Sequence, residues 1–162
     1  MNKENKKRFE QLYLKNKLEN YPSFIGRENC IPPADTKEAG ANDLTRLVID
    51  FIIFNDGQAE RISSMGRYID GTKQVTDCRG RKRTIGTGKY VKSTTTNGTA
   101  DISATIKGRS VKIEIKWKKD TQSDNQKKYQ QSIEKSGGIY IIIKTFDDFI
   151  DWFDNFYSTY LF

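Results

Sequence analysis

Two short stretches of the sequence combine charged side chains with the alternation that is typical of β-strands. Polar and apolar residues alternate over residues 101–106 and again over residues 111–117. The polar positions include Asp101 in the first stretch and both Glu114 and Lys116 in the second. Two carboxylates can bind a divalent cation through oxygen ligands, and a neighbouring lysine adds a positive charge that could stabilise an anionic substrate.

The turn between these stretches predicts how the two strands face each other. Gly108 suits the first central position of a two-residue type II′ turn within the segment Lys107–Ser110. If the ends of this segment pair, Asp101 lies opposite Lys116 and diagonal to Glu114. All three side chains then point to one face of the sheet. A register error of one residue would move Asp101 to the other face.

A longer series of motifs surrounds these three residues. In chain order the series comprises Gly98-x-x-Asp101, Glu114-x-Lys116, Gln126-x-x-Tyr129 and Gly137-Gly138. Over residues 42–145 it resembles the VRR-NUC branch of the PD-(D/E)XK nucleases. Ala100 stands where the name of the superfamily has proline, and this difference removes no ligand.

The resemblance implies an α/β fold with a restriction-endonuclease-like core, in which helices flank a mixed central β-sheet. It also implies a metal-dependent DNA endonuclease that hydrolyses phosphodiester bonds. Compact members of this family occur in viruses and are associated with DNA replication, recombination and repair. The implied partner is duplex or branched DNA, such as a Holliday junction, and the implied assembly is a homodimer with two active sites.

The resemblance also assigns roles to single residues. Asp101 and Glu114 would bind Mg²⁺ or Mn²⁺, with the backbone carbonyl of Ile115 as a further ligand. Lys116 would position the attacking water and balance the charge of the phosphate, and its acidic neighbours favour its protonated form. Gln126 would hydrogen-bond a phosphate or a metal-bound water.

Composition favours an anionic partner and excludes several kinds of catalysis. The 162 residues include 28 Lys and Arg against 21 Asp and Glu, so the net charge is +7. This charge favours nucleic acid as a partner, and basic charge that only aids solubility is the alternative. The absence of histidine excludes His-containing zinc fingers, HNH nucleases and Ser-His-Asp hydrolases. With two cysteines, no signal peptide and no membrane-spanning run, we expect a cytoplasmic protein, in the host cytoplasm if viral, with no membrane partner.

The sequence predicts an N-terminal helix and linker over residues 1–41, followed by the nuclease-like domain over residues 42–162. Residues 3–20 predict a short amphipathic helix. The preferred interpretation is a solvated helix with a thin apolar stripe. The alternatives are that it packs on the domain, pairs with another subunit, or contacts DNA through Lys6, Lys7 and Arg8. Residues 21–41 contain all three prolines and predict a linker or wrapping loop.

The start of the domain predicts one buried helix and one strand. Residues 42–55 are apolar almost all round a helix, which indicates burial. The resemblance allows a further acid on this helix, and Asp43 is the nearest candidate, although the match is poor. An ordinary acid at the start of a helix is the preferred interpretation of Asp43. Residues 58–63 predict the first strand, on which Arg61 could contact a phosphate, brace the active site or form a surface ion pair.

The densest basic run lies in residues 67–97, where a hairpin that turns at Gly80 is expected to present its charges to DNA phosphates. Gly98 could permit a close approach of the backbone to a phosphate. Further DNA contacts are expected from the residues that surround the ligand strands and the next helix. The full set of candidate DNA-binding residues is Arg61, Arg79, Arg81, Lys82, Arg83, Lys89, Lys92, Gly98, Lys118, Lys127, Lys128 and Tyr129.

The C-terminal part predicts a helix, a strand and a second helix. Ser123-x-x-Gln126 fits a capping box at the start of the first helix, and this role competes with the family role of Gln126 for the same side chain. The apolar run 139–143 predicts a strand covered on both faces. Aromatic residues of the last helix are expected in the core, and an excess beyond one helix face favours a homodimer surface: Trp152, Phe156, Tyr160, Leu161 and Phe162.

Two other functions compete with the nuclease. A non-catalytic DNA-binding module would keep the basic surface and cut nothing. An RNA-binding protein is disfavoured, because the chain lacks Gly-x-x-Gly loops and carries acids where stacked bases would lie.

Overall fold

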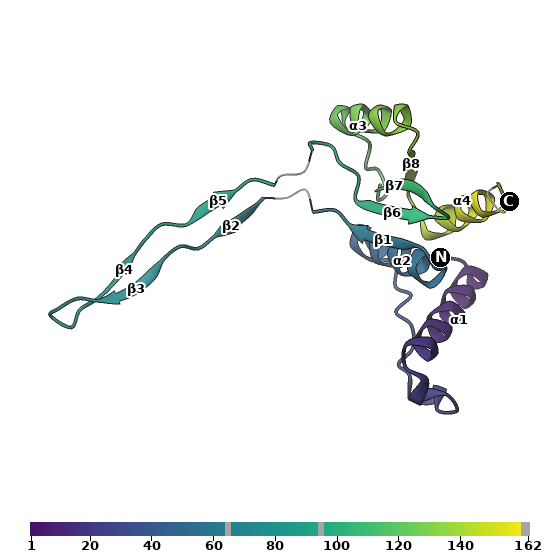
Figure 1. The fold of residues 1–162 in the computed structure, drawn as a ribbon, viewed down its shortest axis with the longest axis horizontal. Coiled ribbons are helices and arrows are strands. Elements are labelled where there is room, and N and C mark those ends of the chain that lie inside the picture. Colours follow the sequence, from purple (N-terminus) through teal and green to yellow (C-terminus); the bar gives the residue numbers. More distant parts are fainter. Residues whose placement is uncertain (64–65, 94–95, 160–162) are drawn as a thin grey trace. The chain divides into compact units, whose positions relative to one another are not determined.

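A central sheet of four strands organises the larger of two compact units (Figure 1). The computed structural model describes residues 1–63, 66–93 and 96–159. One unit comprises Met1–Ile62 with Gly98–Phe162, and the other comprises Ser63–Asn97. The sheet of the first unit has the order β1 (Gln58–Arg61), β6 (Ile102–Ile106), β7 (Arg109–Ile115) and β8 (Ile139–Ile143). The first three strands are antiparallel and β8 is parallel to β7, so the predicted α/β class with a mixed sheet is confirmed.

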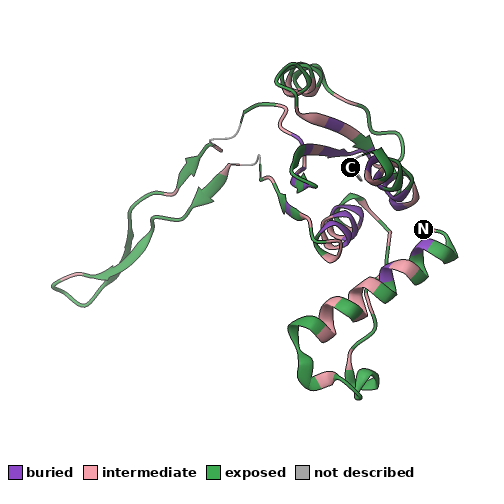
Figure 2. Ribbon diagram, turned by 45° about the vertical axis from the view of Figure 1, so that its right-hand side comes forward, coloured by how far each residue is buried: buried purple, intermediate pink, exposed green. Residues whose placement is uncertain are grey.

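One face of the sheet carries the hydrophobic core (Figure 2). Alternation within β6 and β7 turns their isoleucine, alanine and valine side chains to this face, where α2 (Ala41–Phe54) and α4 (Phe146–Thr159) cover them. Phe51 of α2 lies at the centre, and its ring contacts three phenylalanine rings of α4 at centroid distances of 5.1 to 5.9 Å. The predicted burial of α2 is therefore confirmed.

Helix α1 (Lys3–Asn20) packs on the same core. Phe9 is 1% exposed and its ring contacts Phe54 and Phe146. The guanidinium of Arg8 donates two hydrogen bonds of 2.7 and 2.8 Å to Asp154 of α4. The preferred prediction of a solvated helix was therefore wrong, and α1 packs on the domain because Phe9 is buried in the core. The following segment contains two short 3₁₀ turns, η1 (Pro22–Phe24) and η2 (Glu28–Cys30).

The opposite face of the sheet is polar, and α3 (Asp124–Lys135) lies over it, on the other side of β6 and β7 from α2 (Figure 1). None of the residues of α3 is fully buried. Its aromatic contact is between Tyr129 and Tyr140 of β8, with ring centroids 6.3 Å apart. The predicted capping box of Ser123 and Gln126 is present at its start, and the predicted strand 139–143 follows as β8.

The register of the β6–β7 hairpin differs from the prediction by two residues. The turn is formed by Lys107 and Gly108, which both have positive φ values of 49° and 73°, as a type I′ turn requires. Ile106 therefore pairs with Arg109, and the ladder ends with Ile102 opposite Ile113. The predicted type II′ turn was wrong because Gly108 occupies the second central position, not the first. A shift of two residues keeps every side chain on its predicted face.

The aromatic residues of α4 are used mostly within the unit. Thr145 and Asp148 cap the start of α4 through reciprocal hydrogen bonds of 3.0 and 3.1 Å. Phe156 was expected on an exposed dimer surface but is buried in the core. Trp152 is half-buried and stacks on Phe156 at 5.0 Å. The other members of the expected dimer surface, Tyr160–Phe162, lie outside the described residues.

The second unit is a two-stranded antiparallel ribbon. In one ladder β2 (Arg67–Ile69) pairs with β5 (Lys89–Val91), and in the other β3 (Lys73–Thr76) pairs with β4 (Lys82–Ile85). The predicted hairpin with a turn at Gly80 is confirmed, and all residues of these four strands are exposed. Within the described parts of the chain, no helix is long and apolar enough to cross a membrane.

Replacement of Phe9 by alanine tests whether α1 belongs to the core. We expect Phe9→Ala to lower the free energy of unfolding by about 3–5 kcal/mol, because it leaves a cavity between α1, α2 and α4. The comparison variant is Ile25→Ala, which removes a large apolar side chain that is 66% exposed and is expected to change stability far less. Urea unfolding followed by circular dichroism measures both. Equal losses for the two variants would contradict the packing of α1.

Candidate active site

Two charged side chains are buried on the sheet face beneath α3. Glu114 of β7 is 2% exposed and Lys116, just beyond the end of β7, is 5% exposed. Their neighbours Ile113 and Ile115 point into the core, so alternation forces Glu114 and Lys116 to the opposite face. Burial of a charge is costly unless it is paired and hydrogen-bonded. The surroundings of these two residues must therefore supply partners.

Gln126 of α3 completes a three-way hydrogen-bonded network with the two charges. The ammonium of Lys116 lies 3.0 Å from Glu114 Oε1 and 3.0 Å from Gln126 Oε1. The side-chain amide of Gln126 donates a hydrogen bond to the same Glu114 oxygen. Each member of the network thus contacts both others. Among the described residues, no buried side-chain nitrogen or oxygen is left without a hydrogen-bond partner.

Gln126 has two roles in the structure, the predicted helix cap and the contacts with Glu114 and Lys116, while its family role at a phosphate or a metal-bound water stays a prediction. Its Oε1 accepts a hydrogen bond of 2.9 Å from the backbone N–H of Ser123, which is one half of the capping box. The same oxygen also accepts from Lys116, while the NH₂ group donates to Glu114. Both roles fit because a carboxamide has two lone pairs on oxygen and two protons on nitrogen. The cap therefore places Gln126 at the network.

Asp101 lies just before β6, next to the end of the β6–β7 ladder. The last pair of this ladder is Ile102 with Ile113, so the predicted pairing of Asp101 with Lys116 was wrong. Asp101 Oδ2 accepts a hydrogen bond of 2.9 Å from the N–H of Ile115. The N–H and carbonyl of one strand residue point to the same side of the strand, so the Ile115 carbonyl also faces this edge.

Two further residues extend the site, and the sequence had not assigned them. The hydroxyl of Tyr140, on β8, donates towards Glu114 Oε2 at 3.4 Å, and Tyr140 is 7% exposed. A carboxylate oxygen of Asp120 lies 3.5 Å from Lys116 Nζ. Asp120 could have been found as an acid four residues after Lys116. Tyr140 could be found only with the parallel register, in which Glu114 pairs with Ile142 and Lys112 pairs with Tyr140.

The electrostatic surroundings shift the pKa values of three groups in this site. Burial raises the pKa of Glu114, the contact with Lys116 opposes this shift, and the charge of Asp101 adds to it. Burial alone would lower the pKa of Lys116, but its hydrogen bond to Glu114 and the charges of Glu114 and Asp120 raise it overall. Burial raises the pKa of Tyr140 far above its ordinary value, and the nearby Glu114 carboxylate raises it further. Lys116 is therefore protonated at neutral pH and provides a positive charge rather than a base.

Gly98 brings the chain into contact with the backbone of α3. Its φ is 81°, and a Cβ at this position would lie 2.4 Å from the carbonyl carbon of Asn125 and 2.7 Å from the nitrogen of Gln126. Such separations are far shorter than any real Cβ contact. The close approach predicted for this glycine is therefore made to the first turn of α3, three residues before Asp101.

The remaining predicted residues are distributed over both units. Arg61 lies away from the network, because its guanidinium donates a hydrogen bond of 2.9 Å to Asn42 at the start of α2. Asp43 accepts a hydrogen bond of 3.0 Å from the N–H of Ala39, in agreement with a helix-start acid. Exposed positions next to α3 and within it are occupied by Lys118, Lys127 and Lys128, while Tyr129 is half-buried. The second unit contains Arg79, Arg81, Lys82, Arg83, Lys89 and Lys92.

Metal binding would depend on the pair of acids. In residues 1–63, 66–93 and 96–159, no group of three or more His, Cys, Asp or Glu residues is arranged to hold a metal ion. The Asp101 and Glu114 carboxylates and the Ile115 carbonyl remain as a set of oxygen donors. Comparison with known proteins adds no candidate function, since no family model and no curated protein sequence matches the chain.

Replacement of Gly98 by alanine tests its contact with α3. We expect Gly98→Ala to lower stability by about 1–3 kcal/mol more than Gly137→Ala, because a methyl group at residue 98 displaces the first turn of α3. Gly137 is the matched control, since its φ is 80° and a Cβ there meets nothing within 4 Å. Urea unfolding gives both values. If the two variants lose the same free energy, backbone strain alone accounts for the glycine.

The buried groups also predict an alkaline limit of stability. Since the pKa values of Lys116 and Tyr140 are raised on folding, the unfolded chain releases these protons at lower pH than the folded chain. The free energy of unfolding should therefore fall as the pH rises above about 10. Tyr140→Phe should make this fall shallower, whereas Tyr90→Phe, which removes an exposed hydroxyl, serves as the comparison. Urea unfolding between roughly pH 9 and 11.5 measures the slopes, and an unaltered slope in Tyr140→Phe would refute the assignment.

Proposed function

We propose that this chain is a metal-dependent DNA endonuclease with a restriction-endonuclease-like core. The observation that carries the proposal is the buried Glu114, which is held by Lys116 and Gln126, while the next residue, Ile115, donates its N–H to the Asp101 carboxylate. Burial of a lysine and a glutamate under a polar helix carries a desolvation cost, and stability alone does not explain why the chain places them there. The order of acid, acid, lysine and glutamine along the chain supports the resemblance to VRR-NUC nucleases.

The donor set fits a hard divalent cation such as Mg²⁺ or Mn²⁺. Such ions take oxygen ligands, and the Asp101 carboxylate, the Glu114 carboxylate and the Ile115 carbonyl supply them. Glu114 Oε1 is occupied by Lys116 and Gln126, whereas the contact of Oε2 with Tyr140 is long at 3.4 Å. Oε2 is therefore the Glu114 oxygen that can become a ligand. When bound, the metal would lower the pKa of a water and stabilise charge on the scissile phosphate.

The residues of the chain prepare this site before any ligand binds. Lys116 keeps its proton because Glu114 and Asp120 raise its pKa, so it provides a positive charge next to a phosphate. Gln126 orients the Glu114 carboxylate and carries a polar group from α3 to the sheet. The hydroxyl of Tyr140 on β8 is directed towards the second oxygen of Glu114 at 3.4 Å. Three elements thus fix one carboxylate, as a site for positioned hydrolysis requires.

The substrate that we propose is branched DNA, such as a four-way junction, cut by a homodimer in the cytoplasm. This part is supported by the resemblance and by the basic second unit, which contains eight Lys and Arg residues but only two acids. A two-fold dimer offers two active sites for paired cuts. A non-catalytic DNA-binding module is the second candidate. The observation that favours it is that, among the described residues, no group of three or more His, Cys, Asp or Glu residues is arranged to hold a metal ion.

A cleavage assay separates the two candidates. The purified chain is given single-stranded, duplex, flap and four-way junction DNA with Mg²⁺ or Mn²⁺. We expect cutting that prefers the junction and that falls at least about 100-fold in Glu114→Gln and in Lys116→Met, because each removes one charge of the site. Controls from the same sheet face are Glu60→Gln of β1 and Lys112→Met of β7, which lie outside the network.

Three results of this assay would each reject a different part of the proposal. Binding in EDTA without any nicking by either metal, on all four substrates, would leave the DNA-binding module. Cutting that survives in both Glu114→Gln and Lys116→Met would place the active site elsewhere. Cutting of all duplex forms at equal rates would retain the nuclease and reject the preference for branched DNA.

A further inference from the structure

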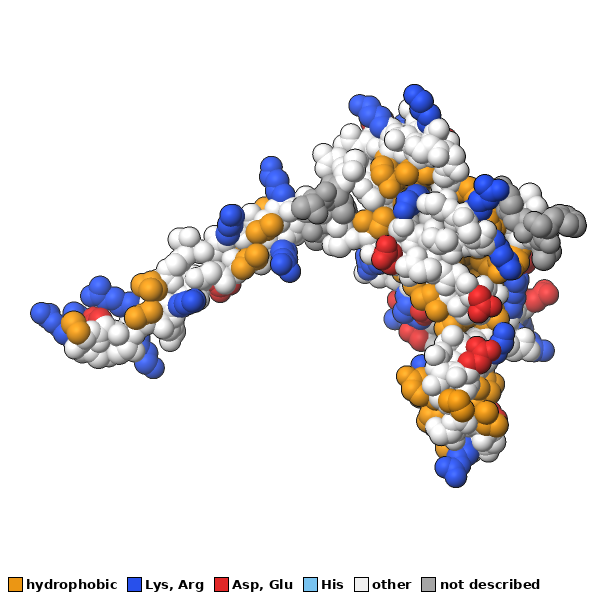
Figure 3. All heavy atoms as spheres, in the orientation of Figure 1, with side chains coloured by type: hydrophobic (Ala, Val, Ile, Leu, Met, Phe, Trp, Pro, Cys, Tyr) orange, Lys and Arg blue, Asp and Glu red, His pale blue; other side chains and the backbone are white. Residues whose placement is uncertain are grey.

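The ribbon of the second unit has two chemically different faces. Its two ladders share one register, since four steps along each strand lead from the pair Ile69–Lys89 to the pair Lys73–Ile85. Within each ladder, side chains that alternate along the strands therefore sort into two faces, and residues 70–72 and 86–88 connect the ladders outside any strand. Figure 3 shows Lys, Arg and hydrophobic side chains interspersed along this unit.

One face consists entirely of pairs that join a cation to a branched aliphatic residue. Every cross-strand pair of this basic–aliphatic face has one member of each kind, and the cation changes strand from one pair to the next in each ladder. The four aliphatic side chains are between 38% and 53% exposed. In order along the ribbon, the pairs are Arg67 with Val91, Ile69 with Lys89, Lys73 with Ile85, and Val75 with Arg83.

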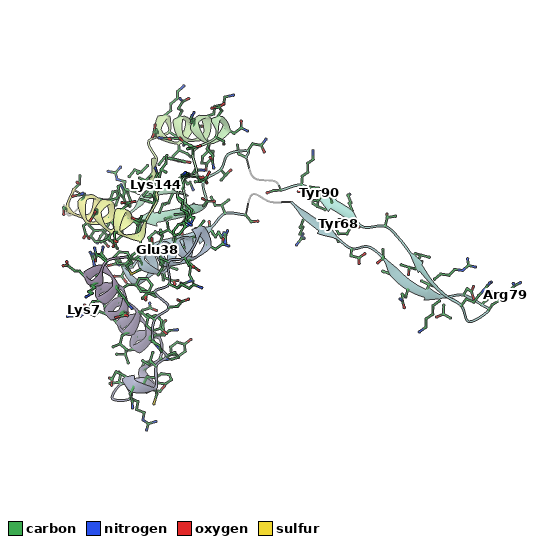
Figure 4. All side chains as sticks on the ribbon, turned by 180° about the vertical axis from the view of Figure 1, so that it is seen from behind. Lys7, Glu38, Tyr68, Arg79, Tyr90 and Lys144 are labelled. Atoms are coloured by element: carbon green, nitrogen blue, oxygen red, sulfur yellow. The ribbon has the colours of Figure 1, made fainter. Side chains whose placement is uncertain are left out.

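The other face uses its large side chains within the ribbon. Tyr68 and Tyr90 form a cross-strand pair there, and Figure 4 labels both. A Cβ on Gly88 would collide with the ring of Tyr68, and a Cβ on Gly66 would lie 2.4 Å from the hydroxyl oxygen of Tyr90. Each tyrosine therefore lies across a glycine and covers ribbon backbone.

The charge of the whole chain is concentrated in this unit. Residues 63–97 contain eight of the 28 Lys and Arg but only two of the 21 Asp and Glu, so they hold +6 of the net charge of +7. Salt bridges among the described residues join Arg81 and Arg83 to Asp77, and include none to Arg67, Lys73 or Lys89. The partner of this surface must therefore be a polyanion that also accepts apolar contact.

We propose that the basic–aliphatic face of the ribbon binds duplex DNA in its major groove. The groove is about 12 Å wide and admits a two-stranded β-ribbon, while phosphates line both of its edges. Cations that alternate between the two strands reach both edges, and the aliphatic side chains between them meet base edges and thymine methyl groups. The inference rests on the DNA partner of the proposed function and not on cleavage. It revises the sequence prediction, because Lys82 pairs with Thr76 on the other face.

Two double variants with equal charge test which face binds. Lys73→Gln/Lys89→Gln removes two cations from the basic–aliphatic face. Lys82→Gln/Lys92→Gln removes two lysines of the same unit that alternation places on the other face. Binding of a fluorescent duplex is measured by anisotropy in EDTA, over a series of salt concentrations. We expect the first variant to weaken binding at least about 10-fold and to reduce the salt slope by about two, and the second to lose less affinity with an unaltered slope.

A third variant tests the apolar part of the face. Val75→Thr/Ile85→Thr keeps every charge and removes apolar surface, so we expect weaker duplex binding at an unaltered salt slope. Double-stranded RNA of the same sequence should bind less tightly than DNA, because its major groove is too narrow for a ribbon. Circular dichroism confirms that the variants fold, which is expected because all the replaced side chains are exposed.

The outcomes separate this inference from the nuclease. Equal losses for the two lysine variants would overturn the assignment of the face, even if the protein cuts DNA. Self-association that disappears in Val75→Thr/Ile85→Thr, with DNA binding intact, would assign the face to a second copy of the chain instead. Binding that follows the expected pattern in a protein that never cuts would support the ribbon and reject the nuclease. Absence of any duplex binding would overturn the inference and the DNA partner together.

Discussion

The burial of one carboxylate and one ammonium beneath a polar helix is the constraint on which the candidate site depends. Glu114 and Lys116 cannot be solvated where they lie, so each must find its partners within the chain. Gln126 supplies them, and it comes from a helix that buries none of its residues completely. The polar network is therefore a main link between α3 and the sheet, and any loosening of α3 would expose two charges at once.

The two faces of the sheet have different roles, since one packs in the core and the other carries the charged groups of the candidate site. Apolar side chains of β6 and β7 pack with α1, α2 and α4, and this packing supplies most of the stabilisation that burial can give. The polar face contributes less to stability and can therefore carry charged groups in fixed positions. Gly98 connects the two requirements, since it lets the chain enter β6 while touching the first turn of α3. The carboxylate of Asp101 and the amide of Gln126 are consequently positioned by the same short segment.

Local sequence patterns predicted the elements but not how they align. The capping box of Ser123 and Gln126 and the apolar run of β8 are local signals, and both elements begin where expected. The β6–β7 register depends on which two residues form the turn, and one glycine at a central position is compatible with two turn types. The contact of Tyr140 with Glu114 depends on a parallel register that α3 sets over a long connection, which no local pattern encodes. The dual role of Gln126 required the positions of its three hydrogen-bonding neighbours, Glu114, Lys116 and Ser123.

The distribution of charge explains why the two units would need each other in the proposed nuclease. The site itself holds Asp101, Glu114 and Asp120 against a single lysine, so it repels a phosphate until a cation is bound. The first unit adds little long-range attraction, because nearly all of the net charge lies in the ribbon. Attraction of a polyanion is thus separated from the groups that would act on it. A chain that combined both tasks in one surface would have to place further lysines, besides Lys116, among the acids that we propose as metal ligands, and those lysines would compete with the metal.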